Sequence, residues 1–288
     1  MIKDYYTLTK PGIIYGNGLT LVAGFILASH EGVLYGLLCA ALIGLSLVIA
    51  SGCVFNNYID RDIDALMERT KKRALVRGVI STKRALLFGT LLGILGFSIL
   101  LLYTNTSTVI ASVIGFFVYV VVYSVWLKRV SPHSALIGSI SGAIPIVVGY
   151  LAVVGKVDIA ASILFLILVF WQMPHSFAIA LYRLHDYKAA SVPVFPVKKG
   201  IKKTKVHMLV YSALFVTAML ALFVYGYVTQ LYLFVMAVLG CIFIGYSLFG
   251  FYCKSDIETT VWARRMFVFS IVILLVFCLM IVIAKTNT

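Results

Sequence analysis

The chain has 288 residues, of which 62% are hydrophobic and only 12% are charged. Soluble domains carry about 25% charged residues, and a soluble fold of this length could not hide so much apolar surface from water. The composition therefore excludes an ordinary soluble protein and predicts that lipid surrounds most of the chain. The net charge of +14 would suggest nucleic-acid binding in a soluble protein, but the positions of the cations explain it differently here.

Apolar runs long enough to cross a bilayer, which takes about 20 residues, follow one another with short polar or charged breaks. Nine such runs lie near residues 12–30, 34–56, 84–103, 108–127, 136–154, 160–181, 206–228, 231–251 and 265–284. This pattern predicts an all-α, polytopic membrane protein with nine transmembrane helices, folded as a single integral membrane domain over residues 1–288.

The cations fall almost entirely on one side of these runs. The N-terminus and every second loop hold 22 of the 24 Lys and Arg residues, and the other side has only Lys156 and Lys285. By the positive-inside rule, the N-terminus is cytoplasmic and the C-terminus lies outside a multi-pass protein of the cell's inner (plasma) membrane. An arrangement of eight spans would break this alternation. The charge is therefore mainly a topology signal, with attraction of anionic lipid or substrate as a secondary reading.

Three oxygen-bearing side chains follow the second apolar run at intervals of four residues: Asn56, Asp60 and Asp64. If the helix continues past its apolar end, these side chains lie on one face, and Asp62 points away from them. Such a stripe suits Mg²⁺, which takes a few carboxylates together with substrate phosphates and water. The alternative reading is a solvated helix end with incidental acids.

Arginines follow the acids at the same interval, as Arg69, Arg73 and Arg77. Bidentate donors in this density fit a phosphate-rich ligand. They would equally serve as a positive-inside anchor, and some of them could neutralise the acids without a metal. Lys10, at the start of the first run, could be an interfacial anchor or could reach the same polar pocket.

A second polar group lies at the end of the sixth run. His175, Tyr182 and Asp186 fall within one stripe if the helix continues through them. Ionisable groups inside a membrane usually face a cavity or a partner, so His175 is a candidate functional residue. A hydrogen bond from His175 to a neighbouring helix is an equally good explanation. Pro174, the residue before it, would kink this helix or free a backbone carbonyl.

Together these segments resemble the UbiA-type intramembrane prenyltransferases. The first Asp-rich motif, at 56–64 with 69–73, identifies the superfamily, and the stretch 171–177 points to the branch whose acceptor is protoheme. Further matching segments lie at 9–14, 51–56, 137–143, 182–187 and 193–197. One departure is that most of the superfamily has two carboxylates in its second motif, whereas this chain has Asp186 accompanied by Tyr182.

The resemblance implies a helical bundle around a cytoplasm-facing cavity, in which farnesyl diphosphate reacts with a vinyl group of protoheme to give heme O. It implies Mg²⁺ as cofactor, farnesyl diphosphate, protoheme and membrane lipid as partners, and no nucleic acid. The next heme-modifying enzyme or the heme-copper oxidase would receive the product. The implied roles are metal binding by Asn56, Asp60, Asp64 and Asp186; catalysis by Asp60, Asp64, His175 and Tyr182; heme binding by His175; and diphosphate binding by Lys10, Arg69, Arg73, Arg77 and Arg183.

Two other functions remain open at this point. A relative of the same superfamily could act on a quinone precursor, although the single carboxylate and the 171–177 stretch favour heme. A transporter would also span the membrane, but transporters usually carry ionisable groups or broken helices near the bilayer midplane. This chain has little there beyond His175 and Pro174, and its charges gather at one face.

Overall fold

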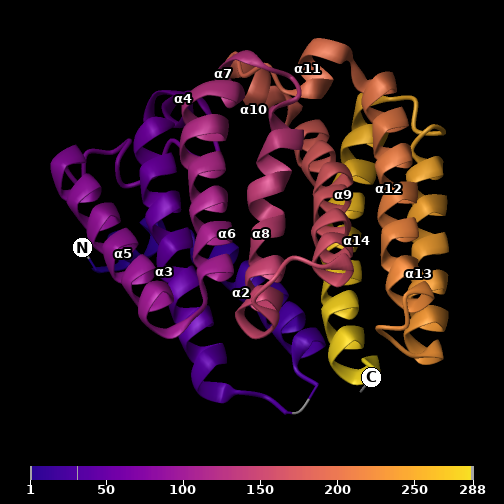
Figure 1. The fold of residues 1–288 in the computed structure, drawn as a ribbon. Helices are drawn as coiled ribbons and strands as arrows, with labels where there is room; N and C mark the ends of the chain where they lie inside the picture. Colours follow the sequence, from indigo (N-terminus) through magenta and orange to yellow (C-terminus); the bar gives the residue numbers. More distant parts are fainter. Residues whose placement is uncertain (1, 31, 287–288) are drawn as a thin grey trace.

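A computed structural model describes residues 2–30 and 32–286 of the chain, and Figure 1 shows an assembly of helices. Of the described residues, nine helices are long and apolar enough to cross a membrane, which confirms the predicted number. They are α2 (Pro11–Ala28), α3 (Tyr35–Ile59), α5 (Thr82–Tyr103), the composite span Thr106–Val130, α8 (Ser134–Val154), α9 (Ile159–Tyr182), α12 (Ile201–Val224), α13 (Gln230–Phe249) and α14 (Asp256–Ala284). The short helices are α1 (Ile2–Leu8), α4 (Arg61–Leu66), α10 (Leu184–Ala189) and α11 (Phe195–Lys199).

The start of α14 shows why charged residues mislead a hydropathy reading. The sequence predicts this helix from residue 265, but it begins at Asp256. Ser255 accepts a hydrogen bond from the Glu258 backbone N–H, and the Glu258 carboxylate accepts from the Ser255 backbone N–H, which forms a capping box. Such a box satisfies backbone donors at a helix start, so the helix extends outward past Arg264 and Arg265.

The composite fourth span contains an unusual helical segment. It runs from α6 (Thr106–Phe117) through a π-helix, η1 (Val118–Leu127), into α7 (Lys128–Val130). In a π-helix each N–H reaches back five residues instead of four, and such segments occur frequently at functional sites. Ser124 follows this wider spacing, because its Oγ donates to the Tyr119 carbonyl at 2.8 Å. No feature of the sequence pattern predicts this segment.

Close contact between helices depends on glycine at particular positions. A Cβ added at Gly24 of α2 would lie 2.0 Å from the Ile146 carbonyl oxygen, and one at Gly149 of α8 would lie 2.0 Å from the Leu21 carbonyl oxygen. No larger residue fits at either place. Since lipid gives little hydrophobic drive for helices to associate, such close backbone packing is the usual way to hold them together.

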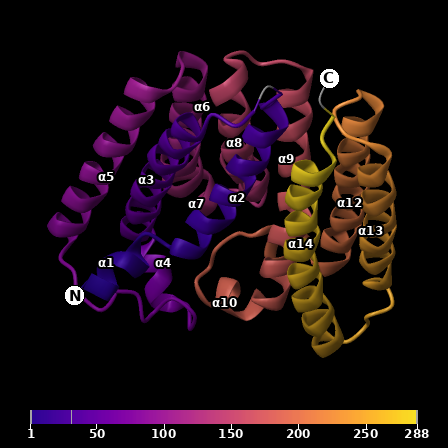
Figure 2. The same ribbon diagram turned by 90° about the horizontal axis from the view of Figure 1, so that it is seen from below.

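The arrangement in space places one group of helices on each side of a shared centre. In Figure 1, α3, α5 and α6 lie on one side and α12, α13 and α14 on the other, with α2, α8 and α9 between them, and Figure 2 shows the same order from below. The main buried cluster includes residues from α2 through α14, whereas large apolar side chains such as Leu102 and Phe234 face outward. The short helices α4, α7, α10 and α11 gather at one end.

Candidate active site

The acidic cluster lies at the end of the molecule where the short helices gather. The helix does not continue unbroken through it, because α3 ends at Ile59 and α4 begins at Arg61, with Asp60 between them. The backbone hydrogen bonds from Asp60 to Asn56 (2.9 Å) and from Asp64 to Asp60 (2.8 Å) nevertheless persist. Asn56, Asp60 and Asp64 therefore remain close together, and each is at most 3% exposed.

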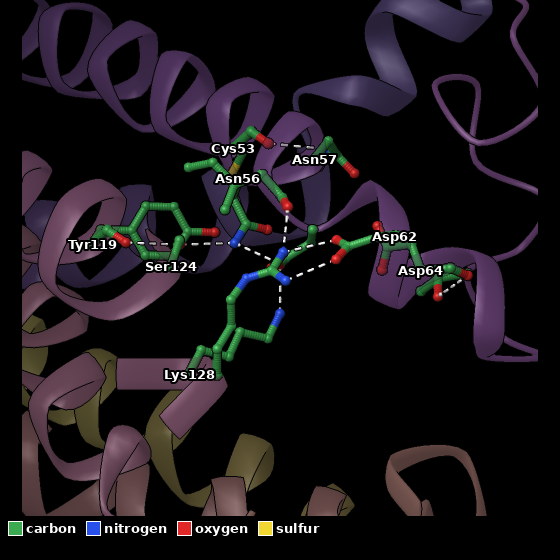
Figure 3. A network of polar contacts seen from close by, with 12 residues as sticks. Cys53, Asn56, Asn57, Asp62, Asp64, Tyr119, Ser124 and Lys128 are labelled. Carbon is green, nitrogen blue, oxygen red and sulfur yellow. Dashed lines mark hydrogen bonds and ion pairs between the residues drawn. The ribbon is translucent and has the colours of Figure 1, made fainter. Parts of the chain in front are cut away.

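Each buried member of this cluster has its own cation. The Lys128 ammonium lies 2.5 Å from Asp60 Oδ2, and the Arg73 guanidinium lies 2.5 Å from Asp64 Oδ2. Lys10 donates to Asn56 Oδ1 and so does reach this polar pocket. Figure 3 shows Asn56, Ser124 and Lys128 pointing toward one another from different helices. Three cations drawn from three separate segments thus converge on one small region.

Asn56 joins the acidic cluster to the π-helix. Its Nδ2 donates both to Asp60 Oδ2, at 2.8 Å, and to Ser124 Oγ, at 2.9 Å. With Lys10 donating to its Oδ1, both ends of the amide are occupied and its orientation is fixed. Burial lowers the pKa of Lys10 to about 8, so a nearby anion would help to keep this ammonium charged.

Asp62 points away from the buried acids, as predicted, and has a different partner. Arg129 donates to both Asp62 carboxylate oxygens at 2.7 Å and to the Ile59 carbonyl at 2.6 Å. This bidentate pair holds the pKa of Asp62 well below its usual range. The contact with Ile59 also satisfies a carbonyl at the end of α3, so Arg129 braces the break between α3 and α4 that carries Asp60.

One oxygen in this cluster has no partner. Asp60 Oδ1 is buried and makes no hydrogen bond with any described group. An ionised oxygen in that position is costly unless something binds it. Within residues 2–30 and 32–286, no three His, Cys, Asp or Glu side chains lie close enough to hold a metal by themselves. The spare carboxylate oxygen of Asp60 is a donor that suits Mg²⁺, which dehydrates reluctantly and is commonly held by one or two carboxylates plus substrate phosphates.

The other predicted diphosphate ligands lie at the surface. Arg69, Arg77 and Arg183 are exposed, and among the described residues none of them forms an ion pair. Arg183 lies over the Tyr182 ring at 5.2 Å, and Arg69 is near enough to Tyr187 to affect it electrostatically. Of the five predicted diphosphate ligands, only Lys10 and Arg73 contact the acidic cluster.

The second polar group does not lie on one continuous helix, so the condition for a single stripe is not met here either. Helix α9 ends at Tyr182, Arg183 has non-helical backbone angles, and Asp186 lies in α10. Tyr182 packs against Phe267 with ring centroids 5.7 Å apart. Asp186 is buried, but within the described part of the chain its carboxylate has no hydrogen-bonding or ionic partner.

His175 is held by α14 and by two aromatic rings. Its Nδ1 lies 2.7 Å from Ser270 Oγ, so the predicted hydrogen bond to a neighbouring helix is present. Trp171 stacks on the imidazole with centroids 4.8 Å apart, and Phe267 lies at the same distance. The imidazole is therefore fixed in position, although His175 also lines the central cavity.

A central cavity of about 680 Å³ extends between Lys128, the counter-ion of Asp60, and His175, and the buried acids themselves do not line it. Cys53, Tyr123 and Lys128 line it near the acidic cluster, and Trp171 and His175 line it farther away. Its volume falls within the range of ligand pockets, roughly 300–1,000 Å³, and most of its lining is apolar. A molecule with an anionic head and a long apolar body would fit this distribution of side chains.

Sequence reasoning missed three residues of this site. Lys128 and Arg129 were interpreted only as topology charges, and Ser124 lies in an apolar run without any distinguishing motif. The one available signal was that Lys128 and Arg129 belong to the cation-rich side that also holds Asp60. Their pairing with particular acids depends on the π-helix, which hydropathy does not reveal.

Comparison with known proteins agrees with this geometry. The sequence model of the UbiA prenyltransferase family matches residues 18–271. A protoheme IX farnesyltransferase of Sodalis glossinidius is 52% identical over 272 residues, which cover 94% of this chain and 91% of the relative. A protein of the same name from Yersinia pseudotuberculosis is 50% identical over the same shares.

Solved structures of low sequence identity share the fold. A digeranylgeranylglyceryl phosphate synthase superposes with a TM-score of 0.81 at 20% identity, covering 98% of both chains. A UbiA homolog from Archaeoglobus fulgidus bound to GPP and Mg²⁺ has a TM-score of 0.69 at 17% identity, covering 97% of this chain and 99% of the other. The chain is a multi-pass membrane protein and belongs to the UbiA prenyltransferase family.

Proposed function

We propose that this enzyme transfers the farnesyl group of farnesyl diphosphate to a vinyl group of protoheme, with addition of water, giving heme O. The high identity to relatives named protoheme IX farnesyltransferase over 94% of the chain carries this proposal. The cavity supports it, because Lys128 lines one end and aromatic rings with a histidine line the other. A diphosphate and a flat, hydrophobic metalloporphyrin need these two environments.

The diphosphate binds at the acidic cluster. Lys10, Lys128 and Arg73 are the cations nearest to it, and Arg69, Arg77 and Arg183 act from the rim. Asp60, with Asn56 and Asp64 beside it, would hold Mg²⁺ jointly with the substrate phosphates, and Asp186 would approach the bound phosphates and metal from the other half of the chain. The ion, when bound there, would supply positive charge to the diphosphate oxygens. Cations already placed where charge develops stabilise a transition state without reorganising during the reaction.

The bond changes balance as follows. The C1–O bond of farnesyl diphosphate breaks, and its electron pair leaves with the diphosphate. The terminal vinyl carbon of protoheme then forms a bond to C1, which leaves a cation on the carbon next to the porphyrin. Water adds to this carbon and loses a proton, which gives the hydroxyethylfarnesyl side chain. The apolar cavity wall keeps other water away from the allylic cation before the new bond forms.

Protoheme binds at the aromatic end of the cavity, near Trp171, His175 and Phe267. Tyr182 orients the acceptor or the captured water from the same side, through its contact with Phe267.

The site opens to the cytoplasm of a bacterial inner membrane, with the N-terminus inside and the C-terminus outside. The product passes to the next heme-modifying enzyme or the oxidase. The chain acts as one domain, since its main core extends from α2 to α14.

The direct test is incubation of purified protein with farnesyl diphosphate, Mg²⁺ and protoheme, followed by mass analysis of the heme. We expect a product heavier by one farnesyl group and one hydroxyl group, and none without Mg²⁺. A quinone precursor supplied in competition should not be prenylated. Prenylation of the quinone precursor with unchanged heme would contradict the proposal and favour another member of the family.

A further inference from the structure

Ser270 of α14 stands at the centre of the contacts that hold His175. Its Oγ lies 2.6 Å from the Phe267 carbonyl and 2.7 Å from His175 Nδ1. Its own carbonyl accepts a hydrogen bond from Trp171 Nε1 at 2.7 Å. Ser270 is fully buried. One residue of α14 therefore contacts both the imidazole and the indole that stacks on it.

These two distances determine which nitrogen of His175 carries the proton. A serine hydroxyl has a single proton to donate, and a backbone carbonyl can only accept. The hydroxyl proton must therefore point to the Phe267 carbonyl, since two oxygen acceptors at 2.6 Å would otherwise repel each other. Ser270 Oγ then has only lone pairs left for His175, so Nδ1 is the donor and Nε2 carries no proton in the neutral ring.

The remaining ring nitrogen is free to bind a ligand. Among the described residues, no group forms a hydrogen bond with His175 Nε2. This nitrogen is not fully buried, so a ligand can reach it. His175 lines the cavity. A neutral imidazole whose Nδ1–H is held by an oxygen presents Nε2 as a metal ligand, in the arrangement that metal sites commonly use.

We propose that Ser270 is a positioning residue that fixes His175 in the Nδ1–H form, so that Nε2 binds the iron of the protoheme substrate. This inference rests on the proposed function, because it takes protoheme as the acceptor. Trp171 and Phe267 add orientation, since the ring between them cannot turn freely. Iron ligation would set the position of the porphyrin, and hence of its vinyl group, relative to the diphosphate end of the cavity.

The first measurement needs no heme. In protein labelled with ¹⁵N-histidine, the ring-nitrogen signals lost in His175→Ala belong to His175. We expect Nδ1 protonated and Nε2 unprotonated at neutral pH. The opposite pattern would overturn the proposal whatever the enzyme's acceptor is, so this outcome is separate from any failure of the proposed function.

The second measurement titrates protein in detergent with ferric protoheme and records the Soret band and the electron paramagnetic resonance spectrum. Wild type should show ligation by one histidine, and His175→Ala should lose it. Loss of an orienting partner to a metal-ligating histidine typically costs about 10–100-fold in affinity, so Ser270→Ala should weaken heme binding by that amount. The KM for protoheme should rise, with the KM for farnesyl diphosphate unchanged.

Three controls separate positioning from structural damage. Ser270→Thr keeps the hydroxyl and should retain the wild-type spectrum. Ser270→Val has nearly the same shape as Ser270→Thr but lacks the hydroxyl, so it should behave like Ser270→Ala. Ser247→Ala removes another fully buried hydroxyl, one without a hydrogen-bond partner, and should change nothing. If wild type forms heme O but His175→Ala keeps the same spectrum, or if Ser270→Ala keeps full affinity, the inference is wrong while the proposed function stands.

Discussion

The two acids that reach the site from opposite halves of the chain, Asp60 and Asp186, are both buried but differ in their surroundings. Asp60 is bonded to Lys128 and Asn56, and one of its oxygens is left over. Asp186, in a short helix of the second half, has no bonding partner among the described residues. The first half is therefore organised without a ligand, whereas we propose that Asp186 gains its partner only when a ligand binds.

The most damaging change should be Asp60→Asn, because Asp60 Oδ1 is buried without a hydrogen-bond partner among the described residues while Lys128 and Asn56 hold its other oxygen. We expect kcat to fall by at least about 10²–10³-fold at every Mg²⁺ concentration, comparable with loss of a main electrostatic stabiliser. Heme-product formation measures the effect, and membrane insertion of the variant is the control. Substantial activity at high Mg²⁺ would remove Asp60 from the metal site.

Asp186→Asn should have a somewhat smaller effect that depends on the ligand. Since Asp186 lacks a partner in the protein, its loss should leave thermal stability unchanged and lower kcat by about 10²-fold. The concentration of Mg²⁺ needed for half-maximal rate should rise, which a metal titration of the initial rate would measure. A drop in melting temperature with normal Mg²⁺ dependence would show that Asp186 has a structural role instead.

Lys128→Met tests whether the first half is held together by its ion pair. Removing one member of a buried pair leaves a bare charge and can cost about 3–5 kcal/mol, whereas replacing both members is often nearly neutral. Lys128 is partly accessible, so we expect a loss toward the lower end. The double variant Asp60→Asn/Lys128→Met should recover the melting temperature but not the activity. Equal destabilisation in the single and double variants would contradict the pairing.

The smallest effect should come from Asp62→Asn, which weakens the brace formed by Arg129. Asp62 is 62% exposed, and exposed pairs contribute about 0–1 kcal/mol, so kcat/KM should fall by no more than about fivefold. Because Arg129 also bonds the Ile59 carbonyl, Arg129→Ala should be worse than Asp62→Asn. Steady-state kinetics in low and high salt would measure both variants, and a larger loss in Asp62→Asn would assign Asp62 a direct role.

The sequence was sufficient for the number and order of the spans and for the two polar groups. Hydropathy and the alternation of charge are properties of each segment by itself, so the spans and their orientation can be predicted without knowing how the helices pack. It was not sufficient for Lys128, whose role depends on a contact across 68 positions, or for the helix breaks at Asp60 and Arg183. Both breaks occur at polar residues where helix periodicity alone predicts continuation.

The π-helix Val118–Leu127 has a consequence for how this site tolerates insertions and deletions. Tyr119 and Lys128 both line the cavity, yet nine positions make two and a half turns of an α-helix, which would put them on opposite sides. The wider turns of the π-helix bring them to the same side. Deleting one residue would leave Lys128 eight positions after Tyr119, which in ordinary α-helical turns is about 80° around the axis, so Lys128 would no longer share the side of Tyr119. The register of a single membrane helix therefore decides whether Asp60 has a counter-ion.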